Sequence, residues 1–303
     1  MNFRIVVLAL TALAVSACSS DPNRLPPDNP FKPEQTTARE QRLQAGELYR
    51  VARASLDSSD FSTAEQRYST LILRFPFTDY AVQGQIDRIY AVYRSYQPED
   101  ALAQAERFLR DYPRHPHADY VQYVKGLVNF DRDRGISDSL GFDTTRRDTS
   151  NLRRSFDDFS LLIQRYPESI YVADARERMI FLRNRIATHE LTVVNYYMRR
   201  GAYVAAAKRA EQLIAQYPGA PATLEALDLL RESYRELGLK DQAKDAARLR
   251  KAYIAENQDL LETADTGSTG SFFGRLFGGS KDSDEPSAEP AAPPAIEPES
   301  SGT

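Results

Sequence analysis

The sequence has no tryptophan, a single cysteine, three histidines and three methionines among its 303 residues. One cysteine excludes a disulfide within the chain, and so few cysteines and histidines leave little material for a metal site. No Gly-rich phosphate loop, HExxH or G-x-S-x-G pattern occurs, so the sequence gives no sign of an enzyme. The net charge of −4 gives no basic footprint for nucleic acid. We therefore expect no cofactor, no metal and no nucleic-acid partner.

The sequence also lacks an apolar run long enough to cross a bilayer, which takes roughly 20 residues. Its main apolar block, residues 5–15, follows the positive charge of Arg4 and ends in small residues, as a secretory signal peptide does. Residues 15–18, VSAC, resemble a bacterial lipobox, in which the chain is cut before the cysteine and the cysteine is acylated. We predict a signal peptide over residues 1–17 and a lipid on Cys18. The alternative is an ordinary signal peptide with an incidental cysteine.

The residue after Cys18 bears on which membrane holds the lipid. Ser19 stands there, whereas an aspartate at that place resembles the inner-membrane retention signal of enteric-type bacteria, and Asp21 comes too late to match it. The sequence therefore favours the outer membrane, with the chain on its periplasmic face.

Two stretches have the composition of flexible segments. Residues 18–37 are rich in Pro, Asp and Asn and read as a lipidated tether. Residues 261–303 are Gly/Ser-rich and then Pro/Ala/Glu-rich, with eight acidic and two basic residues, and are predicted to be a disordered acidic tail. The apolar island FFGRLF at 272–277 is either a motif that docks on a partner or membrane, or an apolar spot without a role.

Between these segments, four stretches end in an aromatic residue followed by proline, at Pro76, Pro113, Pro167 and Pro218. In each, apolar residues stand four and five places before the proline, a spacing that puts them on one face of a helix. The proline then ends the helix, because it lacks an N–H donor and disfavours helical geometry in the residue before it. A small residue that lets a neighbouring helix approach stands twelve places before each proline: Ala64, Ala101, Ser155 and Ala206.

This pattern resembles the tetratricopeptide repeat, a helix–turn–helix unit of about 34 residues. The prolines lie 37, 54 and 51 residues apart, so the later units contain insertions: a long loop near 130–150 and a long helix over 171–198. A fifth unit is predicted at 222–237 and 240–255. We predict an all-α superhelix of about five such repeats over 38–260, with a concave groove, since repeats bury their apolar faces only by stacking.

Local signals add detail to this prediction. The aromatic residues before the four prolines, Phe75, Tyr112, Tyr166 and Tyr217, are expected in the core. Ser62 and Glu65 have the spacing of a capping box, and Pro98 suits a first helical turn.

Few residues suggest chemistry, and each has a plainer interpretation. The cluster His115-Pro116-His117 is a weak metal site and a better turn between repeats. His189 is expected to be structural or solvated. The pair Asp157-Asp158 reads as a helix face and the charged run 131–134 as part of a loop, rather than as acid/base pairs.

Several stretches in order resemble one family, the D component of the outer-membrane β-barrel assembly machinery, or BamD lipoprotein family. They lie at 117–127 (HADYVQYVKGL), 155–159 leading into 165–167, 174–184 (DARERMIFLRN), 189–190 and 196–203. With the lipobox, the resemblance covers nearly everything from residue 1 to about 255, and the acidic tail is outside it.

The resemblance implies a scaffold without catalysis. In that family the C-terminal half of five repeats holds the periplasmic domains of the barrel-forming subunit. The N-terminal half meets accessory lipoproteins and is thought to receive unfolded outer-membrane proteins. Arg199, Arg200 and Gly201 match a family position coupled to the barrel-forming subunit. An arginine fork there grips carboxylates or carbonyls, although a plain helix C-terminus with Gly201 as its cap explains the same residues.

For the N-terminal half, Tyr90, Tyr93 and Tyr96 are candidates for contact with an extended substrate, with core packing as the alternative. Two other functions stay open at this point. One is a generic tetratricopeptide-repeat lipoprotein adaptor, for secretion-pore piloting or cell-wall coordination. The other is an enzyme whose active site lies in the long loop or the tail.

Overall fold

The computed structural model describes residues 37–132, 149–257 and 291–295. The chain divides into two compact units, Met1–Gln41 and Arg42–Thr303. In the first, the described residues form the start of a helix with a capping box: the Thr37 N–H donates to Glu40 Oε2 at 2.8 Å, and the Glu40 N–H donates to Thr37 Oγ1 at 3.3 Å.

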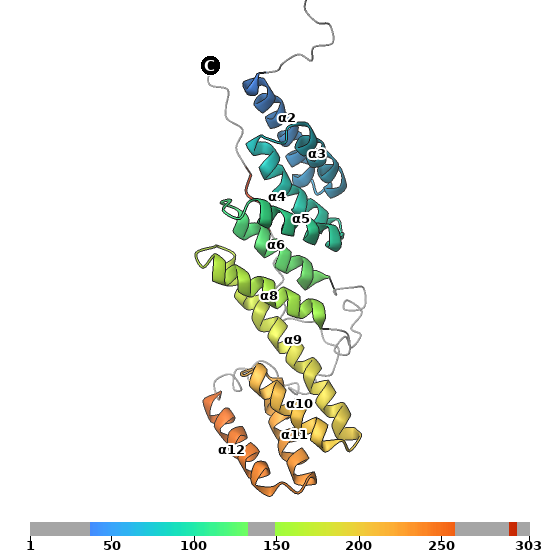
Figure 1. Ribbon diagram of the computed structural model, residues 1–303, viewed down its shortest axis with the longest axis vertical. Coiled ribbons are helices and arrows are strands. Elements are labelled where there is room, and N and C mark those ends of the chain that lie inside the picture. Colours follow the sequence, from blue (N-terminus) through green and yellow to red (C-terminus); the bar gives the residue numbers. More distant parts are fainter. Residues whose placement is uncertain (1–36, 133–148, 258–290, 296–303) are drawn as a thin grey trace, which may run out of the picture. The chain divides into compact units, whose positions relative to one another are not determined.

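The described residues form helices and no strands, in five successive pairs (Figure 1). The pairs are α2 (Ala38–Asp57) with α3 (Phe61–Arg74), α4 (Asp79–Arg94) with α5 (Pro98–Asp111), α6 (Ala118–Asp131) with α8 (Ser150–Arg165), α9 (Val172–Arg199) with α10 (Tyr203–Gln216), and α11 (Ala222–Glu236) with α12 (Lys240–Glu256). The all-α class and the five two-helix units confirm the predicted fold class. Most of the predicted long loop, residues 133–148, lies outside the described residues.

The second helix of each of the first four pairs ends in the same way. The aromatic residue before the proline is the C-cap, and its N–H donates to the carbonyl four residues back, at 2.8–2.9 Å: Phe75 to Leu71, Tyr112 to Phe108, Tyr166 to Leu162 and Tyr217 to Leu213. The proline that follows has no N–H to continue the ladder. All four small residues twelve places before the prolines are fully buried. The predicted helix ends are thereby confirmed.

The expectation that these four aromatic residues belong to the core is only half right. Phe75 and Tyr217 are buried, whereas Tyr112 and Tyr166 are half-buried and pack against the edges of the apolar clusters. The fully buried position is instead one turn earlier, at residues such as Phe108 and Leu162.

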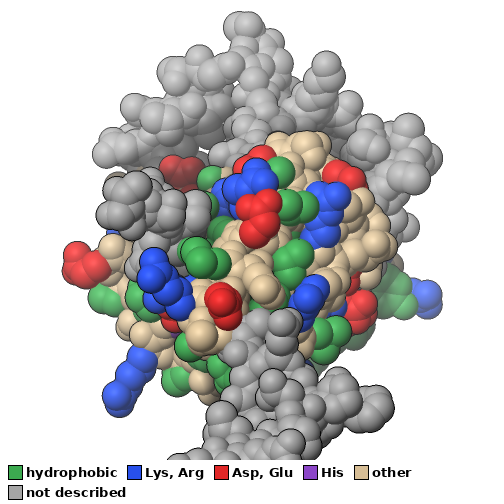
Figure 2. Space-filling view, turned by 90° about the horizontal axis from the view of Figure 1, so that it is seen from above, with side chains coloured by type: hydrophobic (Ala, Val, Ile, Leu, Met, Phe, Trp, Pro, Cys, Tyr) green, Lys and Arg blue, Asp and Glu red, His purple; other side chains and the backbone are tan. Residues whose placement is uncertain are grey.

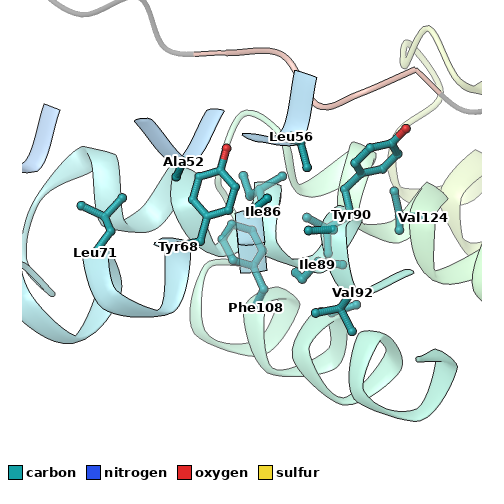
Figure 3. Packing of buried hydrophobic residues seen from close by; sticks show 14 of the residues in the cluster. Ala52, Leu56, Tyr68, Leu71, Ile86, Ile89, Tyr90, Val92, Phe108 and Val124 are labelled. Carbon is teal, nitrogen blue, oxygen red and sulfur yellow. The ribbon is translucent and has the colours of Figure 1, made fainter. Parts of the chain in front are cut away.

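The core is continuous through shared helices. Figure 3 shows one cluster, in which Tyr68, Ile86, Ile89 and Phe108 pack between α3, α4 and α5. Helix α6 contributes to two clusters, because its residues 120, 121, 124 and 128 face one of them and 123, 127 and 130 face the next. Each pair therefore buries its apolar face against its neighbours, as repeat proteins do.

Two local expectations had different outcomes. Pro98 is the first residue of α5, as predicted. The capping box at Ser62 and Glu65 was wrong: α3 begins earlier, and its N-cap is Asp60, whose side chain accepts a hydrogen bond from the Thr63 N–H at 3.1 Å. An aspartate serves as an N-cap as well as a serine does.

The face shown in Figure 2 carries Lys, Arg, Asp and Glu side chains intermixed with apolar ones, with no broad area of one sign. This fits the nearly balanced charge of the sequence. In the ranges that the structure describes, none of the helices combines the length and apolarity needed to cross a bilayer.

Candidate interaction surfaces

The turn between α9 and α10 holds the three residues predicted to contact a partner. Helix α9 ends at Arg199, Arg200 is its C-cap, and Gly201 takes a φ of +68°. The Gly201 N–H donates to Met198 O and the Ala202 N–H to Tyr197 O, both at 3.0 Å, which closes the helix in a Schellman-type turn. A Cβ on Gly201 would meet nothing within 4 Å, so the demand for glycine here comes from the backbone angle alone.

The side chains around this turn form a mixed apolar and cationic surface. Arg199 and Arg200 are exposed, and the Arg200 guanidinium lies 5.2 Å from the centroid of the Tyr196 ring. Tyr196 is 46% exposed and Val204, on the first turn of α10, is 69% exposed. We call Tyr196, Arg199, Arg200 and Val204 the α9–α10 surface. Exposed aromatic and arginine side chains of this kind are enriched at the energetic centres of protein interfaces.

The three tyrosines proposed for substrate contact lie in different environments. Tyr90 is 5% exposed and belongs to the core, 6.3 Å from the ring of Tyr93, whose hydroxyl donates to Asp131. Tyr96 lies just beyond the end of α4, is 93% exposed and takes a φ of +58°, an uncommon angle for a residue with a side chain. The structure therefore packs the half-buried Tyr93 beside the buried Tyr90 and leaves Tyr96 at the surface.

A buried polar cluster on α2, α3 and α4 is absent from the residues that the sequence singled out. Its centre is Asp87, which is fully buried. Asp87 accepts hydrogen bonds from the Tyr68 hydroxyl and from Gln83 Nε2, both at 2.9 Å, and Arg53 Nη1 lies 3.7 Å away. Burial raises the pKa of the Asp87 carboxyl to about 6, although Gln83, Arg53 and Tyr68 oppose the shift. The only sequence signal for this cluster was the pair Gln83 and Asp87, two polar residues four apart on an otherwise apolar helix face.

Of the aspartate pair on α8, Asp158 has a structural role. Asp158 is 7% exposed; it accepts from Asn129 Nδ2 at 2.8 Å and lies 3.1 Å from Lys125 Nζ. The Gln122 side chain donates to the Asp158 main-chain oxygen at 3.0 Å. Asp158 thus joins α8 to α6, and the expectation of a plain helix face holds only for its exposed neighbour Asp157.

The histidine cluster lies in the turn between α5 and α6, where a turn between repeats was expected. The His115 ring packs against Phe108 at 5.5 Å and lies 5.7 Å from the His117 ring, and its burial lowers the pKa of His115. Among the described residues, no group of three or more His, Cys, Asp or Glu side chains is arranged to hold a metal ion. Cys18 and the island at 272–277 lie outside the described residues.

Comparison with known proteins decides the family. The YfiO family, described as "Outer membrane lipoprotein", matches residues 41–249. The chain belongs to this family. The match begins within α2 and ends within α12, so it takes in all five helix pairs.

Members of known name extend the likeness. The chain is 36% identical over 247 residues to the outer membrane protein assembly factor BamD of Neisseria meningitidis, covering 81% of this chain and 89% of that protein. It is 35% identical to the factor of the same name from Pasteurella multocida (79% and 86% covered) and 36% identical to that of Vibrio cholerae (78% and 91% covered). Among solved structures, the MamA protein is similar with a TM-score of 0.33 and 16% identity, covering 71% of this chain and 95% of that one. A likeness that distant says nothing about function.

Proposed function

We propose that this chain is a lipid-anchored scaffold subunit of the machinery that assembles proteins into the outer membrane, acting from the periplasmic face. The observation that supports this most is the likeness to relatives named outer membrane protein assembly factor, over about four fifths of the chain. Those names favour this function over the generic repeat adaptor. The name of the relatives, together with the helical-repeat fold, favours a scaffold over an enzyme.

The anchor is Cys18, acylated within the lipobox of residues 15–18. One acyl chain alone binds a membrane weakly and reversibly, and several chains make attachment stable. The test is incorporation of a clickable palmitate analogue into the wild-type chain and into Cys18→Ala. We expect the label and the outer-membrane fraction to be lost together in Cys18→Ala. Label retained in that variant would rule out acylation at Cys18.

The partner contact is the α9–α10 surface, which meets the periplasmic domains of the barrel-forming subunit. Its chemistry supports this role: Arg200 presents a guanidinium fork that suits carboxylates and carbonyls, beside exposed Tyr196 and Val204. Gly201 closes the turn, which sets the backbone position of Arg200 at the end of α9. The N-terminal half is left for accessory lipoproteins and unfolded outer-membrane proteins.

The experiment is a tagged pull-down from detergent-solubilised membranes. The wild-type chain is compared with Arg200→Ala and with Arg110→Ala, a matched loss of an exposed arginine on α5, 72% exposed. We expect a barrel-forming subunit to be recovered with the wild type and with Arg110→Ala, and to be depleted with Arg200→Ala. Equal recovery with all three would move the contact away from this surface. Failure of the wild type to recover any such subunit would overturn the proposed function.

A further inference from the structure

A short piece of the C-terminal tail, residues 291–295 (AAPPA), lies against the first three helix pairs. In Figure 1 it runs beside α4 and α6, and in Figure 3 it passes above the labelled core residues. Three side chains donate hydrogen bonds to it: Arg53 Nη1 to Pro293 O at 2.8 Å, Gln83 Nε2 to Pro294 O at 2.9 Å, and Tyr120 Oη to Ala291 O at 3.1 Å. Gln83 and Pro294 are 211 residues apart in the sequence. We call Arg53, Gln83 and Tyr120 the donor surface.

The donor surface is built for a main chain that offers only acceptors. All three contacts are from side-chain N–H or O–H groups to main-chain carbonyls of the segment. Proline has no N–H, and alanine and proline side chains form no hydrogen bonds, so carbonyls are most of what AAPPA can offer. Gln83 Oε1, the acceptor of the same amide, is buried and accepts no hydrogen bond among the described residues. The three donors are therefore paired with acceptors of the segment, and Gln83 Oε1 gains no donor from it.

Hydrogen bonds and burial hold the three donor side chains in place. Gln83 is fully buried and donates from the same nitrogen to Asp87 Oδ1 at 2.9 Å, so the buried carboxylate fixes the amide with its other N–H directed to the tail. Arg53 Nε donates to Asp57 Oδ1 at 2.9 Å, and Arg53 Nη1 lies near Asp87 as well as Pro293. Tyr120 is 1% exposed. Side chains fixed in this way lose little further freedom when a ligand binds.

The tail segment is partly buried against the helices. Pro293 is buried, while the other four residues of the segment are exposed. Two consecutive prolines favour the extended polyproline II conformation, whose carbonyls point outward without internal partners. Because the segment is already extended and the donors are already fixed, little conformational entropy is lost when the contact forms.

We propose that the donor surface is a binding site for an extended, proline-containing segment, recognised by its main-chain carbonyls, and that the chain's own residues 291–295 occupy it. The tail is thereby a built-in competitor for any extended segment that uses the same surface. This assigns a role to a tail that lies outside the match to the family, which ends at residue 249.

The test uses the full chain and a fluorescent peptide of residues 286–299, with binding followed by anisotropy. Pro293→Asp places a charge at the buried position and releases the tail of the protein. Ala295→Asp places the same charge at an exposed position of the same segment and serves as its control. We expect Pro293→Asp to bind the peptide about tenfold or more tightly than the wild type, because an intramolecular competitor has a high effective concentration. Ala295→Asp should bind as the wild type does.

A second change tests the donors themselves. In the Pro293→Asp background, Tyr120→Phe removes one hydroxyl and keeps the buried ring, so the fold is retained, which a circular dichroism melt checks. Loss of one hydrogen bond predicts peptide binding about two- to tenfold weaker. Pro293→Asp and Ala295→Asp binding alike, or Tyr120→Phe binding unchanged, would overturn the proposal.

Whether substrate competes with the tail rests on the proposed function and needs a separate probe. We would titrate the same variants with a synthetic ten-residue peptide of alternating apolar and polar residues that ends in Phe. A parallel gain in Pro293→Asp supports competition between tail and substrate. Binding of the tail peptide with no gain for the second probe keeps the tail site and removes substrate from this surface.

Discussion

The ring of Phe159 on α8 lies directly over Gly126 on α6: a Cβ built on Gly126 would come within 2.5 Å of Phe159 Cε1 and 2.7 Å of its Cδ1. Phe159 is fully buried, and Ser155 on the same helix donates to the Gly126 carbonyl at 2.9 Å. The third repeat therefore closes around a glycine that permits the approach of a ring, and a small residue at 155 that permits the approach of the backbone.

Gly126→Ala should therefore destabilise the chain. Overpacking of a closed core costs roughly 1–3 kcal/mol, against about 1 kcal/mol gained by replacing a helical glycine with alanine. Urea melts measure the difference. Gly84→Ala is the control, because its Cβ would come no closer than 3.1 Å to the end of the Leu71 side chain and 3.4 Å to Tyr68 Cδ1. A cost no larger for Gly126→Ala than for Gly84→Ala would contradict the packing described for Phe159.

The N-cap of α3 gives a second test. Asp60→Ala removes the acceptor for the Thr63 N–H and leaves that donor without a side-chain partner. Because hydrogen bonds to Thr63 also lower the pKa of Asp60, the stabilisation is present at neutral pH and weakens in acid. We expect a lower urea midpoint for Asp60→Ala and none of that loss for Ser62→Ala. The reverse ranking would restore the capping box.

Asp158 should be much more sensitive than Asp157. The Asp158 carboxylate is a partner of both Asn129 and Lys125, and it is largely buried. Asp158→Ala removes this partner from both side chains. Such a loss costs about 2–4 kcal/mol. Asp157→Ala, at an exposed position of the same helix, should cost less than about 0.5 kcal/mol. Chemical denaturation of both variants decides, and similar values would mean that the polar cluster adds nothing to stability.

The buried carboxyl of Asp87 predicts a pH dependence. Burial raises its pKa to about 6 in the folded chain, against about 3.9 unfolded. Between these values the folded form binds a proton that the unfolded chain has released. The stability that this carboxyl contributes is therefore full below about pH 4 and is lost as the pH rises through about 6, by up to about 3 kcal/mol.

Asp87→Asn removes this titration. Whatever its offset, the unfolding free energy of the variant minus that of the wild type should rise between pH 4 and pH 6.5 and then level off. Urea melts across that range measure it. A difference that stays flat with pH would show that Asp87 titrates alike in the folded and unfolded chain.

Local rules explain what the sequence predicted and where it failed. The helix ends at Pro76 and its equivalents were predictable because proline acts on its own residue and the one before it. The start of α3 was not, because Asp60 and Ser62 both cap well and only the packing of the helix decides between them. The binding of residues 291–295 to the donor surface could not be predicted from the sequence. The contact is made by main-chain carbonyls, which every residue has, and the composition of the tail is typical of disorder.

If the α9–α10 surface is the partner contact that we propose, the stacking of Arg200 on Tyr196 predicts that the two residues act as one unit in binding. If the ring holds the guanidinium in place, Tyr196→Ala weakens binding partly by freeing Arg200, and the double variant loses less than the sum of the single losses. An exposed cation–π contact is worth about 0.5–1 kcal/mol, which sets the expected coupling. The measurement is the Kd for the purified periplasmic domains of the barrel-forming subunit, with Arg110→Ala as control. Strictly additive losses would mean that Tyr196 and Arg200 contact the partner independently, and that their stacking is incidental to recognition.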